Sequence, residues 1–261
     1  MIFLPVLVFA VGLIVGSFLN VVILRMNTGR SVVSGRSMCA RCSRPLAWYE
    51  LIPVFSFLAL RGKCRTCRQP ISFQYALVEL TTAVVFVVCY IRIVIAGGFV
   101  GSAWLAYLFT LVIASMLIVI FVYDMRHKII PDGVVYPFIL LSFLALVWRT
   151  STLHTSLFLE LIHGTLVALP FFFLWYFSKG RAMGFGDVKL ALGIGWLVRL
   201  AIGYGVFLLA FWIGGIVGLF LLGINRKYNM KSQIAFGPFL IIGLFIAGLW
   251  GVTISSLFPL W

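Results

Sequence analysis

Residues 102–123 read SAWLAYLFTLVIASMLIVIFVY, an apolar run of 22 residues without a charge that ends directly before Asp124. About 20 apolar residues at helical rise cross the hydrocarbon of a bilayer, and a helix satisfies its own backbone hydrogen bonds there. The run therefore predicts a membrane-spanning helix. The composition agrees, because 63% of the 261 residues are hydrophobic and only 10% are charged, whereas about a quarter of the residues in a soluble domain are charged.

The same pattern recurs along the chain and predicts an all-α membrane protein with about eight transmembrane helices. They are expected at residues 3–24, 74–96, 102–123, 133–149, 157–177, 187–199, 202–223 and 235–257. The sixth is short enough to be tilted or re-entrant. The first has no basic stretch before it, so we expect a retained helix in which Gly12 and Gly16 allow close helix packing. We expect no internal repeat.

The basic residues indicate the topology. All but three of the 20 Lys and Arg residues fall in loops that eight crossings place on one side, and the exceptions are Arg92, Arg149 and Arg199. The positive-inside rule assigns the basic loops to the cytosol and both termini to the outside. Anionic lipid headgroups are a sufficient partner for the net charge of +14, so we do not expect nucleic-acid binding.

The polar segment 25–73 holds four of the five cysteines, Cys39, Cys42, Cys64 and Cys67, as two C-x-x-C pairs with 21 residues between them. This spacing is typical of two knuckles around one tetrahedral zinc, and a redox pair is the alternative. Four thiolates leave no open position, so the metal would organise the loop. We expect a first helix (1–24), a cytosolic zinc-binding domain (25–73) and a polytopic domain (74–261), with Cys89 as a packing residue.

The chain has only six acidic residues, and each is informative because an ionisable group near hydrocarbon is costly. They are Glu50, Glu79, Asp124, Asp132, Glu160 and Asp187. Asp124 and Asp187 both fall at the cytosolic ends of predicted spans. Paired carboxylates suit amide hydrolysis, since one activates water while the other donates to the carbonyl oxygen.

The helix ends suggest how the two roles divide. Asp124 stands at the C-terminal, negative end of its predicted helix and Asp187 near the N-terminal, positive end of another, so we expect Asp187 to be the base and Asp124 the acid. The pair could also share one proton. Gly184 and Gly186 would let a substrate backbone approach Asp187.

Structural alternatives exist for each of these acids. Asp187 could cap a helix, Asp132 is expected to cap the fourth span, and Asp124 could pair with Arg126 or Lys128. Glu79 is expected to be a polar partner facing the bundle interior, Glu160 an outer-boundary residue, and Glu50 carries no assignment. Other hydrolytic chemistries have no support, because the sequence contains no G-x-S-x-G, no H-E-x-x-H and no glycine-rich phosphate loop.

Taken in order, the motifs of this chain resemble those of the type IV prepilin peptidases, the bifunctional leader peptidases and N-methyltransferases. The motifs are GLIVGSFLNVVILR (12–25), GRS (35–37), IPV (52–54), LRGKCRTC (60–67), PIS (70–72), LVELT (77–81), IPD (130–132), MGFGDVKL (183–190) and FGPF (236–239). One departure is Ala235, where many relatives have proline. The resemblance implies that the aspartate before IPD and the one in G-x-G-D, here Asp124 and Asp187, are catalytic.

The resemblance also implies the substrates and cofactors. Prepilins or pseudopilins would be cut after a glycine that precedes an apolar helix, at the cytosolic face of the bacterial inner membrane. S-adenosylmethionine would then methylate the new N-terminus, although we assign no residues to this cofactor. A noncatalytic scaffold or transporter of a secretion system with a zinc-stabilised loop is the alternative, and the sequence leaves the oligomeric state open.

Overall fold

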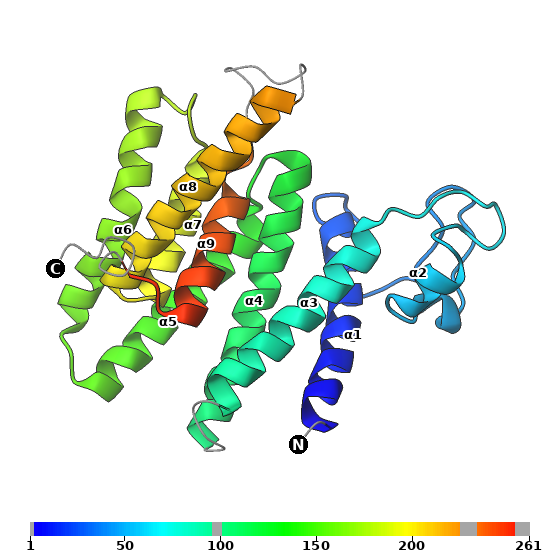
Figure 1. The fold of residues 1–261 in the computed structure, drawn as a ribbon, viewed down its shortest axis with the longest axis horizontal. Coiled ribbons are helices and arrows are strands. Elements are labelled where there is room, and N and C mark those ends of the chain that lie inside the picture. Colours follow the sequence, from blue (N-terminus) through cyan, green and yellow to red (C-terminus); the bar gives the residue numbers. More distant parts are fainter. Residues whose placement is uncertain (1–2, 96–100, 225–233, 254–261) are drawn as a thin grey trace. The chain divides into compact units, whose positions relative to one another are not determined.

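The computed structural model describes residues 3–95, 101–224 and 234–253. Eight longer helices follow one another in the described part of the chain (Figure 1). They are α1 (Phe3–Arg25), α3 (Gln74–Tyr90, continued by the π-helical turn Ile91–Ile95), α4 (Gly101–His127), α5 (Asp132–Leu153), α6 (Leu157–Ser178), α7 (Phe185–Leu197), α8 (Leu200–Ile224) and α9 (Gly237–Trp250). Each corresponds to one predicted span, and the described residues form no β-strand, only two isolated β-bridges, so the all-α class is confirmed.

The helices differ in their ability to cross a membrane. Six of those described are long and apolar enough: α1, α3 with its π-helical turn, α4, α5, α6 and α8. The other two are shorter than the roughly 20 residues that a crossing needs, because α7 has 13 residues and α9 has 14. The sixth span was expected to be short. The last was expected to reach residue 257, and its residues beyond 253 lie outside the described part.

The chain divides into two compact units, Met1–Val119 and Ile120–Trp261, with the boundary inside α4. The expected division at residues 24 and 73 stays a prediction. In the first unit α1 packs directly on α3. A Cβ added at Gly12 would lie 2.5 Å from the Cα of Ala83, and one at Gly16 would lie 2.7 Å from the Cα of Glu79. Close packing through these two glycines is therefore confirmed.

The segment between α1 and α3 contains the 3₁₀ turn Trp48–Leu51 and the short helix α2 (Phe55–Ala59). Glu79 of α3 is buried, and its carboxylate accepts a hydrogen bond of 2.8 Å from the backbone amide of Val54, the residue before α2. Val54 has a φ of 60°, which a β-branched residue rarely adopts. The expected interior position of Glu79 is confirmed, and its carboxylate ties the loop to the helix.

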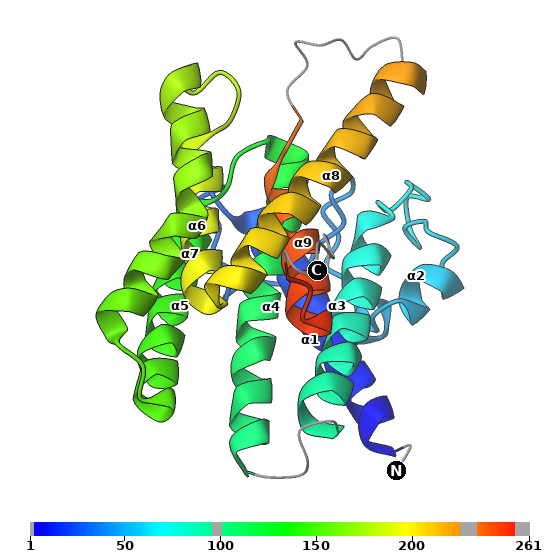
Figure 2. The same ribbon diagram turned by 60° about the vertical axis from the view of Figure 1, so that its left-hand side comes forward.

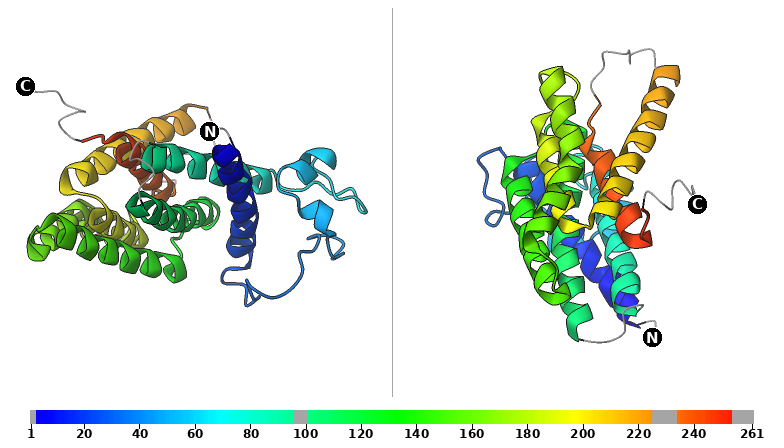
Figure 3. Two further views of the ribbon diagram at one scale, coloured as in Figure 1. Left: turned by 90° about the horizontal axis from the view of Figure 1, so that it is seen from below. Right: turned by 90° about the vertical axis from the view of Figure 1, so that its left-hand side faces the viewer.

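In the second unit α7 lies between α5 and α6, and α9 runs alongside α8 (Figures 2 and 3). Glycines permit these contacts, since Gly193 of α7 faces Phe138 of α5, and Gly195 faces Gly164 of α6. Any larger side chain at these positions would separate the helices. The short helix α7 is thus held along its length by two longer neighbours.

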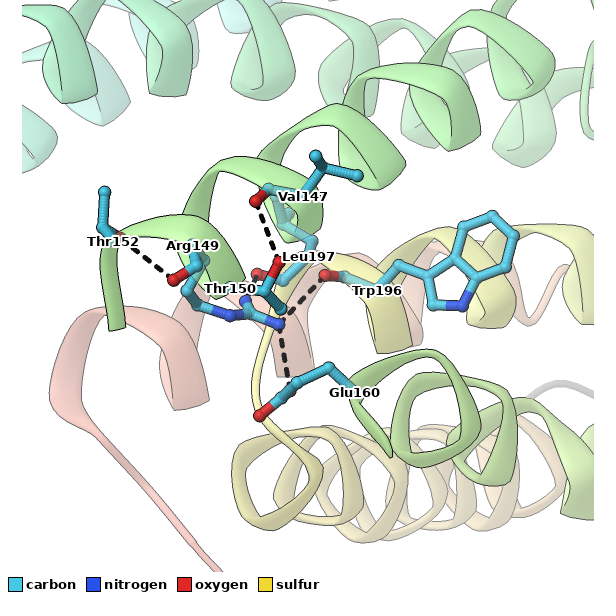
Figure 4. Close-up of polar contacts among 7 residues, drawn as sticks. All are labelled: Val147, Arg149, Thr150, Thr152, Glu160, Trp196 and Leu197. Atoms are coloured by element: carbon cyan, nitrogen blue, oxygen red, sulfur yellow. Dashed lines mark hydrogen bonds and ion pairs between the residues drawn. The ribbon is translucent and has the colours of Figure 1, made fainter. Parts of the chain in front are cut away.

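The C-terminal end of α7 is capped by a side chain from α5 (Figure 4). Arg149 donates to the carbonyl oxygens of Leu197 at 2.8 Å and Trp196 at 3.4 Å, and it pairs with Glu160 of α6 at 3.4 Å. The last carbonyls of a helix lack intrahelical partners, and Arg149 supplies them. This network fixes the end of α7 that lies opposite Asp187.

Candidate active site and metal centre

Asp124 lies in the last turn of α4 and is only 4% exposed. The first residue of α9, Gly237, packs against it, and the backbone amide of Gly237 faces the carboxyl group. A Cβ added at Gly237 would lie 2.7 Å from Oδ2 of Asp124. Within the described residues this oxygen is buried and has no hydrogen-bond partner, so it is available to a ligand.

Asp187 lies in the first turn of α7 and is 8% exposed. Gly184 is the N-cap residue of the helix, and its backbone amide faces the Asp187 carboxyl group. This is the contact that an acidic residue in the first turn makes with the start of its helix. Its Oδ1 is buried without a partner in the described part of the chain. Asp187 thus contacts the helix start while leaving one oxygen free.

The two carboxyl groups belong to the same compact unit and are close enough to interact electrostatically. Ile130, in the turn between α4 and α5, connects the segments that carry them. A Cβ at Gly186 would lie 2.9 Å from Cβ of Ile130, and one at Gly237 would lie 3.3 Å from its Cδ1. Gly186 therefore permits close packing against Ile130, and the expectation that Gly184 and Gly186 admit a substrate backbone stays a prediction.

The structure also tests the structural alternatives that the sequence offered for Asp124 and Asp132. Asp124 forms no ion pair among the described residues, so pairing with Arg126 or Lys128 is wrong. Pro131 is the N-cap residue of α5, so the expectation that Asp132 caps this helix is also wrong. Asp132 instead pairs with Lys189 of α7, because the side chain at the first helical position is free to reach across to the neighbouring helix.

The four cysteines of the first unit form one cluster. Their sulfur atoms all lie within 4.8 Å of one another, and the Sγ atoms of Cys39 and Cys67 are 3.8 Å apart. Four sulfurs at the usual zinc distance of about 2.3 Å in a tetrahedron would be about 3.8 Å apart. The donor set and its spacing therefore fit a tetrahedral metal ion.

The two cysteine pairs have the same local structure. The bridge Met38–Pro45 around the first pair matches Lys63–Pro70 around the second, and each first cysteine donates its amide to a carbonyl five residues on, at 3.0 Å and 2.8 Å. The two knuckles expected from the cysteine spacing are therefore present, and they share the sequence pattern C-x-x-C-x-x-P at 39–45 and 64–70.

The first cysteine of each knuckle is stabilised as a thiolate. The backbone amides of Cys67 and Thr66 donate to the sulfur of Cys64 and lower its pKa to about 6. The equivalent amides of Cys42 and Arg41 lower the pKa of Cys39. Amides placed in this way stabilise the negative charge that a metal ligand must carry.

Glu50 has a structural role that the sequence reasoning missed. Its carboxylate accepts hydrogen bonds from Arg44 at 2.7 Å and from the backbone amide of Ala47 at 2.9 Å. These contacts lower the pKa of Glu50, with the Arg44 bond as the largest cause. Because Arg44 belongs to the first knuckle, its bond to the buried carboxylate holds the knuckle in place. The signal was a glutamate three residues after Ala47, the spacing of a capping contact.

Comparison with known proteins identifies the family. The model of the bacterial peptidase A24 N-terminal domain matches residues 10–93, and the model of the type IV leader peptidase family matches residues 111–219. The chain is 31% identical over 275 residues to a protein of Aeromonas hydrophila, across 95% of this chain and 91% of the relative. It belongs to the type IV leader peptidase family.

Further members show the same relationship. A protein of Myxococcus xanthus is 37% identical over 233 residues, across 87% of this chain and 66% of the relative. One of Pseudomonas aeruginosa is 31% identical over 279 residues, across 94% and 89%. All three relatives carry the name prepilin leader peptidase/N-methyltransferase. No solved structure matches the chain.

The expected family and enzyme class are thus confirmed for this multi-pass membrane protein. The first family model covers the four cysteines, and the second covers Asp124 and Asp187. The matches therefore separate the metal centre from the aspartates in the same way as the two compact units do.

Proposed function

We propose that this leader peptidase family member cleaves prepilins or pseudopilins after a glycine, with Asp124 and Asp187 as the catalytic pair. The observation that carries the proposal is that two buried carboxyl groups, from helices far apart in the sequence, lie within electrostatic range of each other, and each has one buried oxygen without a partner among the described residues. A burial of this kind is costly for a structural carboxylate, and it suits a site that receives a polar substrate.

The two carboxyls act as a unit that shares one proton, because they interact electrostatically in a buried site and two negative charges there would repel each other. The ionised member takes a proton from water while the water oxygen bonds to the carbonyl carbon. The protonated member donates its proton to the carbonyl oxygen. When the C–N bond breaks, the amine leaves with the proton taken from water, and the carbonyl proton returns to its donor, which restores the pair.

The assignment of Asp187 as base and Asp124 as acid considered only the helix that carries each residue, but a second helix, α9, also acts on Asp124. Asp124 lies in the last turn of α4, but it also faces the N-terminus of α9 through Gly237, as Asp187 faces the start of its own helix. Both carboxyls therefore lie at positive helix ends. The dipoles support one negative charge on the pair without deciding which member carries it.

The site would lie at the cytosolic boundary of the membrane. With eight crossings, all but three of the basic residues would fall on the side of Asp124 and Asp187, and the positive-inside rule assigns that side to the cytosol. A substrate with a basic leader followed by an apolar helix would place its scissile bond at this depth. Its basic leader gains nothing from these basic loops, so selectivity comes from the glycine at the cut.

Cys39, Cys42, Cys64 and Cys67 would hold a structural zinc ion that joins the two knuckles. The ion would supply folding energy to a segment with too small a core to fold unaided. With four thiolates around it, it has no open position for substrate. We further propose that the new N-terminus is methylated from S-adenosylmethionine, as the names of the relatives imply.

One experiment tests the proposal against a noncatalytic scaffold. Detergent-solubilised protein is incubated with a full-length prepilin, with and without S-adenosylmethionine, and the product masses are read. We expect loss of the leader, and a further methyl group only with the cofactor. Asp124→Asn and Asp187→Asn, checked for unchanged thermal unfolding, should release no leader. If both variants cleave like the wild type, the two aspartates are not the catalytic pair.

A further inference from the structure

An ion pair beside the proposed catalytic residues has no part in the mechanism so far. The amine of Lys189 pairs with the Asp132 carboxylate. It also lies 4.9 Å from the ring centre of Tyr136 and 5.8 Å from that of Phe185, within the range of cation–π attraction. The lysine side chain is 15% exposed, while that of Asp132 is 62% exposed. The cation is thus enclosed by aromatic rings, with the carboxylate on its open side.

The ion pair between Lys189 and Asp132 lies between the two segments that carry the proposed catalytic aspartates. Asp132 begins α5, and only the turn 128–131 separates it from α4, which carries Asp124. The amide of Lys128 bonds to the Asp124 carbonyl at 2.7 Å, which closes the last turn of α4 directly before this connection. Lys189 lies two residues after Asp187 on α7. The pair therefore links the segment after one carboxyl to the helix that bears the other.

The apolar side chain of Ile130 also packs against Gly186 between these segments. An apolar contact is not directional, so it resists separation but allows sliding. The ion pair is directional, and the two rings restrict where the amine can lie. The ion pair therefore fixes how the first turn of α7 sits against the start of α5, as the Arg149 hydrogen bonds fix the opposite end of α7.

We propose that Lys189, held by Asp132 and Tyr136, is a positioning residue that sets the separation of the Asp124 and Asp187 carboxyls. The inference rests on the proposed function, in which both carboxyls act on one peptide bond. Because the carboxylate of this pair is 62% exposed, water screens the interaction and it contributes little to stability, so its loss should leave the fold intact. Loss of the ion pair should instead lower kcat, because a displacement of about 1 Å in a reacting group can reduce the rate about 100-fold.

The test measures kcat and KM for prepilin cleavage by the full-length protein in detergent. Lys189→Met should lower kcat by about 100-fold and leave KM nearly unchanged, because the residue aligns reacting groups and does not bind substrate. Asp132→Asn should cause a smaller loss, since the amine keeps its aromatic rings. The double variant should equal Lys189→Met alone, because both changes break one interaction. Lys189→Arg should restore most of the rate.

Lys128→Met is the matched control, because this exposed lysine of the same turn forms no ion pair among the described residues; it should cleave like the wild type. Asp132→Asn, which changes an exposed carboxylate, keeps the test decisive if Lys189→Met fails to fold. Wild-type kcat in both Lys189→Met and Asp132→Asn would overturn the inference, as would a raised KM at unchanged kcat, or additive losses in the double variant. In each case an inactive Asp187→Asn leaves the proposed function standing. Failure of the wild type itself to cleave would instead overturn the proposed function.

Discussion

The four cysteines and the two aspartates are both reactive sets, but the chain assembles them in different ways. Each cysteine pair is formed within one short turn, and its amides are supplied by the next few residues. The aspartates meet only because α4, α7 and α9 pack around Ile130. A local site should depend on its own loop and its metal, whereas a packed site should respond to glycines and helix contacts far away in the sequence.

The largest effect expected from this comparison is a loss of cleavage activity without any loss of bound zinc. Asp124→Asn or Asp187→Asn should lower the cleavage rate by about 10⁴-fold or more, because catalytic residues that act as a unit lose nearly all activity when one is removed. Both variants should keep the zinc content of the wild type, measured by elemental analysis of purified protein. Loss of zinc along with activity would mean that the two sites are not independent.

The second prediction concerns the metal centre. Cys64→Ser removes one of four thiolates and should release most of the zinc, because the metal's binding energy is the folding energy of such a loop. Limited proteolysis should then cut within residues 26–73. The matched control is Cys89→Ser, a buried cysteine of α3 outside the cluster, which should retain its zinc. Equal zinc loss in both variants would contradict a site made of these four cysteines.

A smaller effect is expected at the contact between Asp124 and α9. Gly237→Ala adds a Cβ 2.7 Å from Oδ2 of Asp124, so the carboxyl or the helix must shift, and kcat should fall by about 10- to 100-fold. Gly223→Ala is the control, since nothing lies within 4 Å of the added atom, and it should cleave like the wild type. Equal rates for the two variants would show that the start of α9 does not hold Asp124 in place.

Much of this arrangement could be predicted from the sequence because it depends on local pattern. Runs of apolar residues located all eight helices, and the cysteine spacing located the cluster. The scarcity of acidic residues drew attention to Asp124 and Asp187, because a carboxyl group near hydrocarbon is energetically costly and is often functional. Their proximity was inferred from topology alone, because two positions at the same membrane boundary can meet without either crossing it.

The features that could not be predicted from the sequence are contacts between side chains of different helices, because they depend on which helices pack together. FGPF was recognisable as a motif, but nothing local indicates that its Gly237 packs on Asp124. The partner of Asp132 is Lys189, on another helix, and Arg149 caps a helix to which it is not adjacent in sequence. Helix-end rules assign a residue to its own helix, so they missed the second helix end at Asp124 and the role of Gly186 against Ile130.

The smallest effect is expected at Glu50, the brace of the first knuckle. Its folded-state pKa is lowered by the Arg44 hydrogen bond and then by the Ala47 amide, so folding favours the ionised form. This contribution is fully present above the unfolded pKa of about 4.3 and is lost as pH falls through the lower folded value. Glu50→Gln should therefore release zinc to a chelator slightly faster than the wild type at pH 7.

The difference in the rate of zinc release between Glu50→Gln and the wild type should narrow below about pH 4.3. Acid speeds zinc release in both proteins, because it protonates the thiolates. Glu160→Gln is the control, because its carboxylate pairs with Arg149 in the other unit and should leave zinc release unchanged at every pH. A gap between Glu50→Gln and the wild type that persists at low pH would mean that the side chain braces the knuckle through its shape alone. The charge on Glu50, and with it the Arg44 pair, would then have no part in holding the metal loop.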